Sequence, residues 1–225
     1  MTHANKIFDS ARQTEITQRV EQLEQKTSAE IVCAVANESG RYDRAESIIG
    51  LLCAFILLVS IHALSAWWVP AGDWTHSGLS MVLQIPILVV GFVLGSILAS
   101  YWFGFRRFFT RETEMAEEVD RAACLIFTRS SIGETDTRCG LLIYLSLFEH
   151  KVVLLADQAV REVLSDQRIQ ELCDLAVSEI KAGRISRVFE TLMDALEPEL
   201  SKHLPADREL NPNELSDHVL IANRF

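Results

Sequence analysis

A long apolar segment at residues 48–105 constrains this chain more than any other feature of its sequence. The segment has no Lys, Arg or Glu, and its only full charge is Asp73. Two runs within it, 48–69 and 79–103, have the roughly 20 mostly apolar residues that a helix needs to cross a bilayer. A short polar turn separates them. The sequence therefore predicts a transmembrane helical hairpin at residues 47–105.

The charges beside the two spans indicate how the hairpin crosses the membrane. Arg41 and Arg44 precede the first span, and the second is followed by Arg106, Arg107 and Arg111, whereas the turn has neither Lys nor Arg. Because positive charge collects on the cytoplasmic side, we expect a two-pass protein of the bacterial inner membrane with both termini in the cytoplasm. The alternative is a buried helical hairpin of a soluble protein, which is unusual at this length without charge.

The sequences on either side of the hairpin are typical of soluble α/β structure. Residues 1–46 and 106–204 are predicted to be two parts of one cytoplasmic α/β domain, and 205–225 a polar C-terminal tail. Apolar spacing predicts helices at 10–26, 112–127, 166–182 and 187–202, and short apolar runs predict strands at 29–36, 140–147 and 151–156.

The connections between these strands predict a mixed sheet. Only three residues join 140–147 to 151–156, which implies an antiparallel pair. The first strand reaches the second through a helix, which favours a parallel crossover. We therefore expect an α/β fold in which helices flank a mixed sheet.

Charge and cysteine spacing exclude some classes of function. The formal net charge is −10, which argues against a nucleic-acid partner. The five cysteines show no C-x-x-C spacing, so they are interpreted as small core residues rather than zinc ligands or disulfides.

Four motifs in order resemble those of TPM domains, the family named for a thylakoid lumen protein, a photosystem II repair protein and a nematode modulator of acetylcholine receptors. They are Thr27-Ser28-Ala29-Glu30-Ile31, the strand Thr137-Arg138-Cys139-Gly140 with the apolar residues after it, the strand ending Ala156-Asp157, and Asn211-Pro212-Asn213-Glu214-Leu215-Ser216-Asp217. The resemblance implies a three-layer α/β domain and a role in repair, assembly or modulation of membrane proteins. It also implies the acid phosphatase activity or calcium binding proposed for some members.

This chain departs from the family pattern at several positions. Cys139 stands where Asn is usual, Ser216 where Pro is usual, and Ala156 where Gly is common before the strand-ending Asp. The apolar hairpin is inserted after the first strand. A Gly would let a ligand approach the backbone closely, so Ala156 puts such binding in doubt.

Asp157 is the candidate catalytic residue. It follows a strand, and in α/β sheets ligands and metals gather at the ends of strands. Its carboxylate could hold a divalent cation, Ca²⁺ or Mg²⁺, or start phosphate chemistry; otherwise it caps the next segment. Arg138 could hold an anion, or pair with Asp136 or Asp157.

The tail offers a second set of oxygen ligands. Asn213, Glu214 and Asp217 could bind calcium, although the spacing is not that of an EF-hand, and a capping role is the alternative. No cofactor follows with certainty from these residues.

The predicted spans carry few features other than apolar bulk. His62 and Gln84 lie at similar depths and are expected to hydrogen-bond, which would join the two helices. Gly91, Gly95 and Ala99 form a small-residue face that packs either on the first span or on another membrane protein.

These features favour a non-catalytic accessory, assembly or modulatory factor for a membrane-protein complex. The lipid bilayer and a membrane protein, or a second copy of the chain, are the expected partners. One rival is a metal-dependent acid phosphatase using Asp157, although the sequence has no D-x-D-x-T or C-x5-R motif. The other is a scaffold that self-associates through Gly91 and Gly95.

Overall fold

The computed structural model describes residues 4–67, 80–101, 107, 110–135, 137–206, 215 and 218–224. Contacts divide the chain into two compact units. Residues 41–112, with Met1, form the unit that holds the helical hairpin; 2–40 and 113–225 form the α/β domain. The domain is therefore assembled from sequence on both sides of the insertion.

Four strands form one mixed sheet in the order β3-β2-β1-β4. β1 (Glu30–Ala36) runs parallel to β2 (Gly140–Ser146) and to β4 (Leu220–Ala222), and β2 runs antiparallel to β3 (Lys151–Ala156). The mixed sheet and both predicted pair orientations are confirmed. β4 is an additional strand, and its three residues are too few to show a strand pattern in the sequence.

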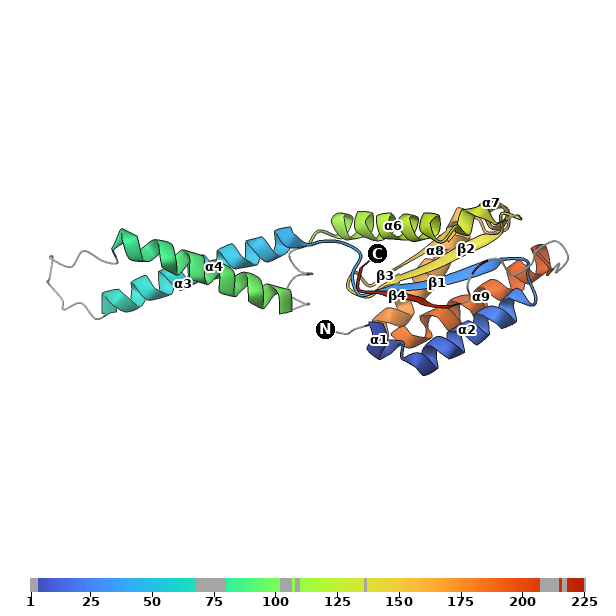
Figure 1. The fold of residues 1–225 in the computed structure, drawn as a ribbon, viewed down its shortest axis with the longest axis horizontal. Coiled ribbons are helices and arrows are strands. Elements are labelled where there is room, and N and C mark those ends of the chain that lie inside the picture. Colours follow the sequence, from blue (N-terminus) through green and yellow to red (C-terminus); the bar gives the residue numbers. More distant parts are fainter. Residues whose placement is uncertain are drawn as a thin grey trace. The chain divides into compact units, whose positions relative to one another are not determined.

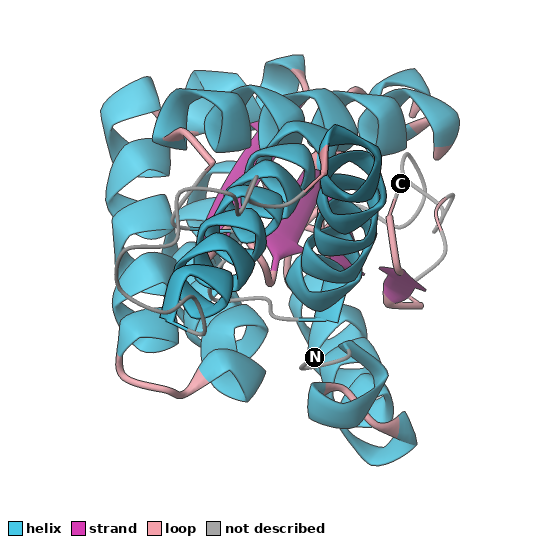
Figure 2. Ribbon diagram, turned by 90° about the vertical axis from the view of Figure 1, so that its left-hand side faces the viewer, coloured by secondary structure: helices cyan, strands magenta, loops and turns pink. Residues whose placement is uncertain are grey.

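Helices cover both faces of the sheet (Figure 1). Alternate side chains such as Cys33 and Ile143 pack in one core with α2 (Ser10–Glu24), α8 (Asp166–Lys181) and α9 (Val188–His203). The residues between them pack on the opposite face with α6 (Glu112–Arg129). Figure 2 shows how little of the chain is strand. The arrangement is the expected three-layer α/β domain.

The ends of the helices are defined by local contacts. Asp9 caps α2, and its side chain accepts from Arg12 N at 2.9 Å. A 3-10 turn (Ile185–Arg187) leads into α9. Gly183 follows α8 with φ of 75°, the left-handed conformation that glycine adopts without steric cost.

Three short elements lie outside the predicted pattern. They are α1 (Ala4–Ile7), a 3-10 turn at Ile132–Glu134, and α7 (Gln158–Val163), which follows β3 directly. Elements of six residues or fewer bury too little apolar surface to leave a helical period in the sequence.

The insertion consists of two long helices, α3 (Asp43–Trp67) and α4 (Met81–Tyr101). Each contains a stretch, Glu46–Ser65 and Met81–Ser100, that is long and apolar enough to span a membrane. The helices pack against one another as a pair (Figure 1). The predicted turn between them lies outside the described residues.

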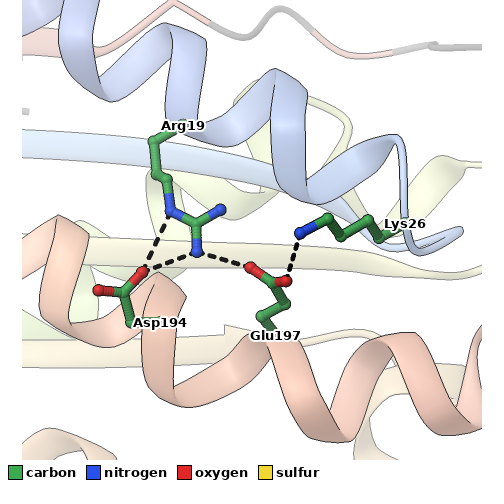
Figure 3. Close-up of polar contacts among 4 residues, drawn as sticks. All are labelled: Arg19, Lys26, Asp194 and Glu197. Carbon is green, nitrogen blue, oxygen red and sulfur yellow. Dashed lines mark hydrogen bonds and ion pairs between the residues drawn. The ribbon is translucent and has the colours of Figure 1, made fainter.

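An ion-pair cluster joins α2 to α9 on the domain surface (Figure 3). The Arg19 guanidinium donates to Asp194 at 2.7 Å and to Glu197 at 2.6 Å, and Lys26 Nζ donates to the second oxygen of Glu197 at 2.6 Å. The hydrogen bonds from Lys26 and then Arg19 hold the pKa of Glu197 below its ordinary value of 4.5. Glu197 therefore favours the folded state while it is ionised.

We predict that Glu197→Gln lowers the free energy of unfolding at pH 7 by up to about 1 kcal/mol, the size of partly exposed ion pairs. Because the folded-state pKa is lowered, the wild-type advantage is complete above pH 4.5 and is lost as the pH falls through the folded-state value. Unfolding of the full-length chain in detergent, followed by circular dichroism across pH, measures both effects. Glu21→Gln on the exposed side of α2 is the control. A pH-independent difference would contradict the prediction.

Candidate functional site

Asp157 lies at the opposite edge of the sheet from the carboxyl ends of β1 and β2. β3 is antiparallel to its neighbour, so its last residue lies beside the start of β2, where Asp157 N donates to Gly140 O at 2.8 Å. The rule that ligands bind at the carboxyl ends of strands applies to parallel strands. That argument for a ligand at Asp157 therefore does not apply in this sheet.

Asp157 caps the start of α7. Its Oδ1 accepts from Gln158 N at 2.7 Å, whereas Oδ2 is buried with no hydrogen-bond partner among the described residues. The residue lines a hollow of about 460 Å³ together with Phe127, Arg161 and Glu162. The capping interpretation thus has a geometric basis in the structure.

Among the described residues, no cluster of metal-binding side chains accompanies Asp157. Within them, no three His, Cys, Asp or Glu side chains converge as a metal site would require. Ca²⁺ and Mg²⁺ take six or more oxygen ligands. At this hollow the predicted divalent cation would have the carboxylates of Asp157 and Glu162, fewer protein oxygens than such an ion takes.

Arg138 contributes its backbone here rather than its charge. It is exposed and adopts a left-handed φ of 50°, and its carbonyl accepts from Ala159 N at 3.1 Å at the start of α7. Among the described residues no ion pair joins it to Asp157, and Asp136, the other possible partner, lies outside them.

The predicted calcium ligands of the tail, Asn213, Glu214 and Asp217, also lie outside the described residues and stay predictions. Between them, Leu215 N donates to the carboxylate of buried Glu30 at 3.0 Å.

A buried polar cluster occupies the carboxyl edge that sequence reasoning passed over. Ser39, Tyr144, Ser146 and Glu149 form this carboxyl-edge network. Ser39 Oγ lies 2.7 Å from both Tyr144 Oη and Ser146 Oγ, and Ser146 Oγ donates to Glu149 Oε2. Ser39 N donates to Glu149 Oε1 at 2.8 Å. The network therefore ties the segment after β1 to the turn after β2.

Burial determines what the carboxyl-edge network can do. Glu149 is 1% exposed, Ser146 and Tyr144 are fully buried, and Ser39 is 4% exposed. Burial raises the pKa of Tyr144 to about 12. A dissolved substrate cannot reach these hydroxyls, so the network stabilises the domain rather than catalysing a reaction. The antiparallel pairing of β2 and β3 could have placed Ser146 and Glu149 at this edge from the sequence, whereas no local signal indicated that Ser39 joins them.

A second polar contact closes the same edge. Asn37 Oδ1 accepts from Ala4 N at 2.6 Å, and Asn37 Nδ2 donates to Asn223 Oδ1 at 2.6 Å. The ends of β1 and β4 and the start of α1 are thereby joined where the chain leaves the sheet for α3.

In the hairpin, the small residues of α4 face α3. A methyl group added at Gly91 would lie 2.7 Å from Ala54 Cα, and one at Gly95 would lie 2.5 Å from Cys53 Cβ. Ala99 is 2% exposed. Of the two partners left open by the sequence, the first span is the one that these glycines contact.

His62 and Gln84 lie near each other in the hairpin. Both line a hollow of about 510 Å³, together with Leu58, Val59 and Ala63. Their predicted hydrogen bond stays a prediction, whereas their placement on the two helices at one hollow follows from the structure.

Comparison with known proteins finds a similar fold among solved structures. No curated protein matches the chain. Among solved structures, the BA42 protein of the psychrophilic bacterium Bizionia argentinensis, determined by NMR, is similar with a TM-score of 0.58. The similarity covers 99% of this chain and 100% of BA42 at 13% identity, so it concerns the fold alone.

The chain is thus a three-layer α/β protein with a helical hairpin inserted after the first strand. The family model of the TPM domain matches residues 107–198, which confirms the resemblance seen in the sequence. This segment of the chain is therefore similar to a TPM domain. The match begins after the insertion, and β1 from the preceding segment completes the sheet.

We predict that Glu149→Gln lowers the free energy of unfolding by about 1–3 kcal/mol, because an amide nitrogen replaces one buried acceptor and leaves a donor opposite a donor. Tyr144→Phe removes one hydroxyl and should cost about 1 kcal/mol. Denaturant unfolding of the full-length chain in detergent, followed by circular dichroism, measures both. Glu117→Gln on the exposed side of α6 is the control. Equal stability of the Glu149 and Glu117 variants would refute a stabilising role for the network.

Proposed function

We propose that this chain is a two-pass membrane protein whose TPM domain acts as a non-catalytic accessory or assembly factor for a membrane-protein complex. The observation that carries the proposal is the division of polarity in the hairpin. Small residues pack inside it, and large apolar side chains cover its outside. Water does not favour such an exterior, whereas hydrocarbon does.

The exposure of the two helices supports membrane insertion over burial in a soluble core. Only 17% of the apolar window of α3 and 11% of that of α4 is buried. The outward side chains include Phe55 and Ile56 on α3 and Val82 and Leu94 on α4, each more than half exposed. A core helix of a soluble protein would bury such residues against its own chain.

Backbone chemistry supports the same placement. All α-helical hydrogen bonds form within one segment, so a pair of helices can lie in lipid without leaving polar groups unsatisfied. Arg41 and Arg44 before the first span, and Arg111 after the second, favour placing the TPM domain in the cytoplasm of a bacterial cell.

The chemistry of the domain supports an accessory role over catalysis. The hydroxyls of the carboxyl-edge network are enclosed, and Asp157 caps a helix. Phosphoryl transfer requires groups that position the phosphate and neutralise its charge. Arg161 lines the hollow at Asp157, but no metal cluster accompanies it among the described residues. A membrane-anchored domain without such a constellation is suited to holding a partner.

We predict that the full-length chain stays in the membrane fraction after an alkaline carbonate wash. In a cysteine-free variant, Ser77→Cys should react with a membrane-impermeant maleimide in intact cells. A variant that keeps only Cys124, which is exposed on α6, should react only after the cells are opened. Release by carbonate would contradict insertion, and the reverse labelling pattern would place the domain on the outside.

We predict that the full-length chain, purified from its native membranes in mild detergent, carries one membrane-protein complex in a fixed ratio. Mass spectrometry and native gel analysis measure this. Generic phosphomonoester substrates should release no phosphate with or without Mg²⁺ or Ca²⁺. Turnover that is lost in Asp157→Ala and retained in Gln158→Ala would overturn the accessory role and favour the phosphatase.

A further inference from the structure

Asn37, the first residue after β1, joins both ends of the α/β domain to the sheet. It is 6% exposed, and its backbone and its side chain both donate and accept hydrogen bonds. Its backbone N–H donates to Ala222 O at 3.1 Å, and its carbonyl accepts from Phe148 N at 2.9 Å. Its side chain accepts from Ala4 N and donates to Asn223 Oδ1, both at 2.6 Å. The residue therefore connects α1, β4 and the turn between β2 and β3.

The side-chain amide of Asn37 links the two chain ends mechanically. Its oxygen and nitrogen belong to one planar group, so they turn together about a single bond. The bond to Asn223 therefore fixes the direction in which the oxygen points at Ala4 N. Rotation about that bond is otherwise broad. Without Asn223, the oxygen would point at the Ala4 N–H for only part of the time.

Both chain ends are short elements that depend on such contacts. α1 has four residues, and β4 has three, all of them half-buried. A helix of this length is not stable by itself in water, and chain ends open at low free energy. α1 and β4 also lie in contact with each other. The loss of one hydrogen bond at their junction is therefore large compared with the local stability of either end.

Other contacts hold each end separately. Phe8, directly after α1, packs edge-on against Phe189, with ring centroids 5.6 Å apart. Arg224, beside β4, forms an ion pair with Glu38. The hydrogen bonds of Asn37, by contrast, reach both ends from one side chain.

We propose that Asn37 couples the two ends of the domain, so that α1 and β4 dock on the sheet and release from it together. A coupling free energy between two sites is reciprocal. A partner molecule that lifts β4 from the sheet therefore loosens α1, and one that lifts α1 loosens β4 by the same factor. The proposal concerns the α/β domain alone and depends neither on membrane insertion nor on an accessory role.

Hydrogen exchange of the full-length chain in detergent, followed by mass spectrometry, tests the coupling. Asn223→Ala removes the acceptor of the Asn37 amide, and because Asn223 is exposed the substitution disturbs no core packing. Exchange of residues 4–8 should become up to about fivefold faster, the effect of losing about one net hydrogen bond. Unchanged exchange of residues 4–8 would overturn the proposal.

Two control variants separate coupling from general loosening. Asn223→Asp keeps an acceptor oxygen for Asn37 Nδ2, so exchange of residues 4–8 should stay at the wild-type rate. Ser28→Ala removes a hydroxyl that donates to Pro205 O at 2.7 Å near the opposite end of β1, and it should also leave residues 4–8 unchanged. Equal acceleration in the controls and in Asn223→Ala would refute the coupling.

A double variant tests whether Asn37 itself carries the coupling. Asn37→Ala should accelerate exchange of residues 4–8 and 219–224 together, while exchange of residues 140–146 in β2 stays unaltered. Adding Asn223→Ala should then change residues 4–8 no further, because the link is already cut. A further acceleration as large as in the wild-type background would show that other contacts join the two ends. If Asn37→Ala does not fold, the two Asn223 variants decide the proposal.

Discussion

The parallel pairing of β1 with β2 is the interaction on which the rest of this protein depends. The register runs from Glu30 beside Gly140 to Ala36 beside Ser146, across the whole inserted hairpin. Closing so long a loop costs conformational entropy that grows slowly with length. A helical hairpin limits this cost, because it returns the chain to where it started: Gly50 near the start of α3 contacts Ser96 near the end of α4. The insertion therefore leaves the central strand pair intact.

The same strand pair determines which edge of the sheet carries chemistry. β1, β2 and β4 all end at one edge, where the carboxyl-edge network and Asn37 close the structure. β3 runs the other way, so Asp157 lies at the opposite edge and begins α7. The buried carboxylate of Glu149 is retained because Ser39 and Ser146 satisfy it, which makes this edge rigid where the chain departs for α3.

In the hairpin, small and large residues lie on different sides of the helices. Glycines that could have served self-association serve helix packing instead, and bulky apolar side chains are left for the surroundings. The helices approach closely at Gly91 and Gly95, and a hollow with two polar residues remains at His62 and Gln84.

The sequence by itself determined the elements whose signals are local. Apolar spacing located α2, α6 and α8, the lack of charge located α3 and α4, and a three-residue link predicted the antiparallel β2–β3 pair. Four short motifs indicated the TPM family, which the match to residues 107–198 confirms. These predictions succeeded because periodicity, capping and turn length act over a few residues.

Only the tertiary structure decided what depends on residues far apart in the chain. β4 and α7 are too short to show a pattern and exist because β1 and β3 position them. Ser39 meets Ser146 and Glu149 across more than a hundred residues, and no local signal joins them. The small face of α4 had two sequence-compatible partners, and the contact of Gly95 with Cys53 selects one. Packing makes such choices because burial and hydrogen bonding are satisfied by neighbours in space, whichever part of the chain supplies them.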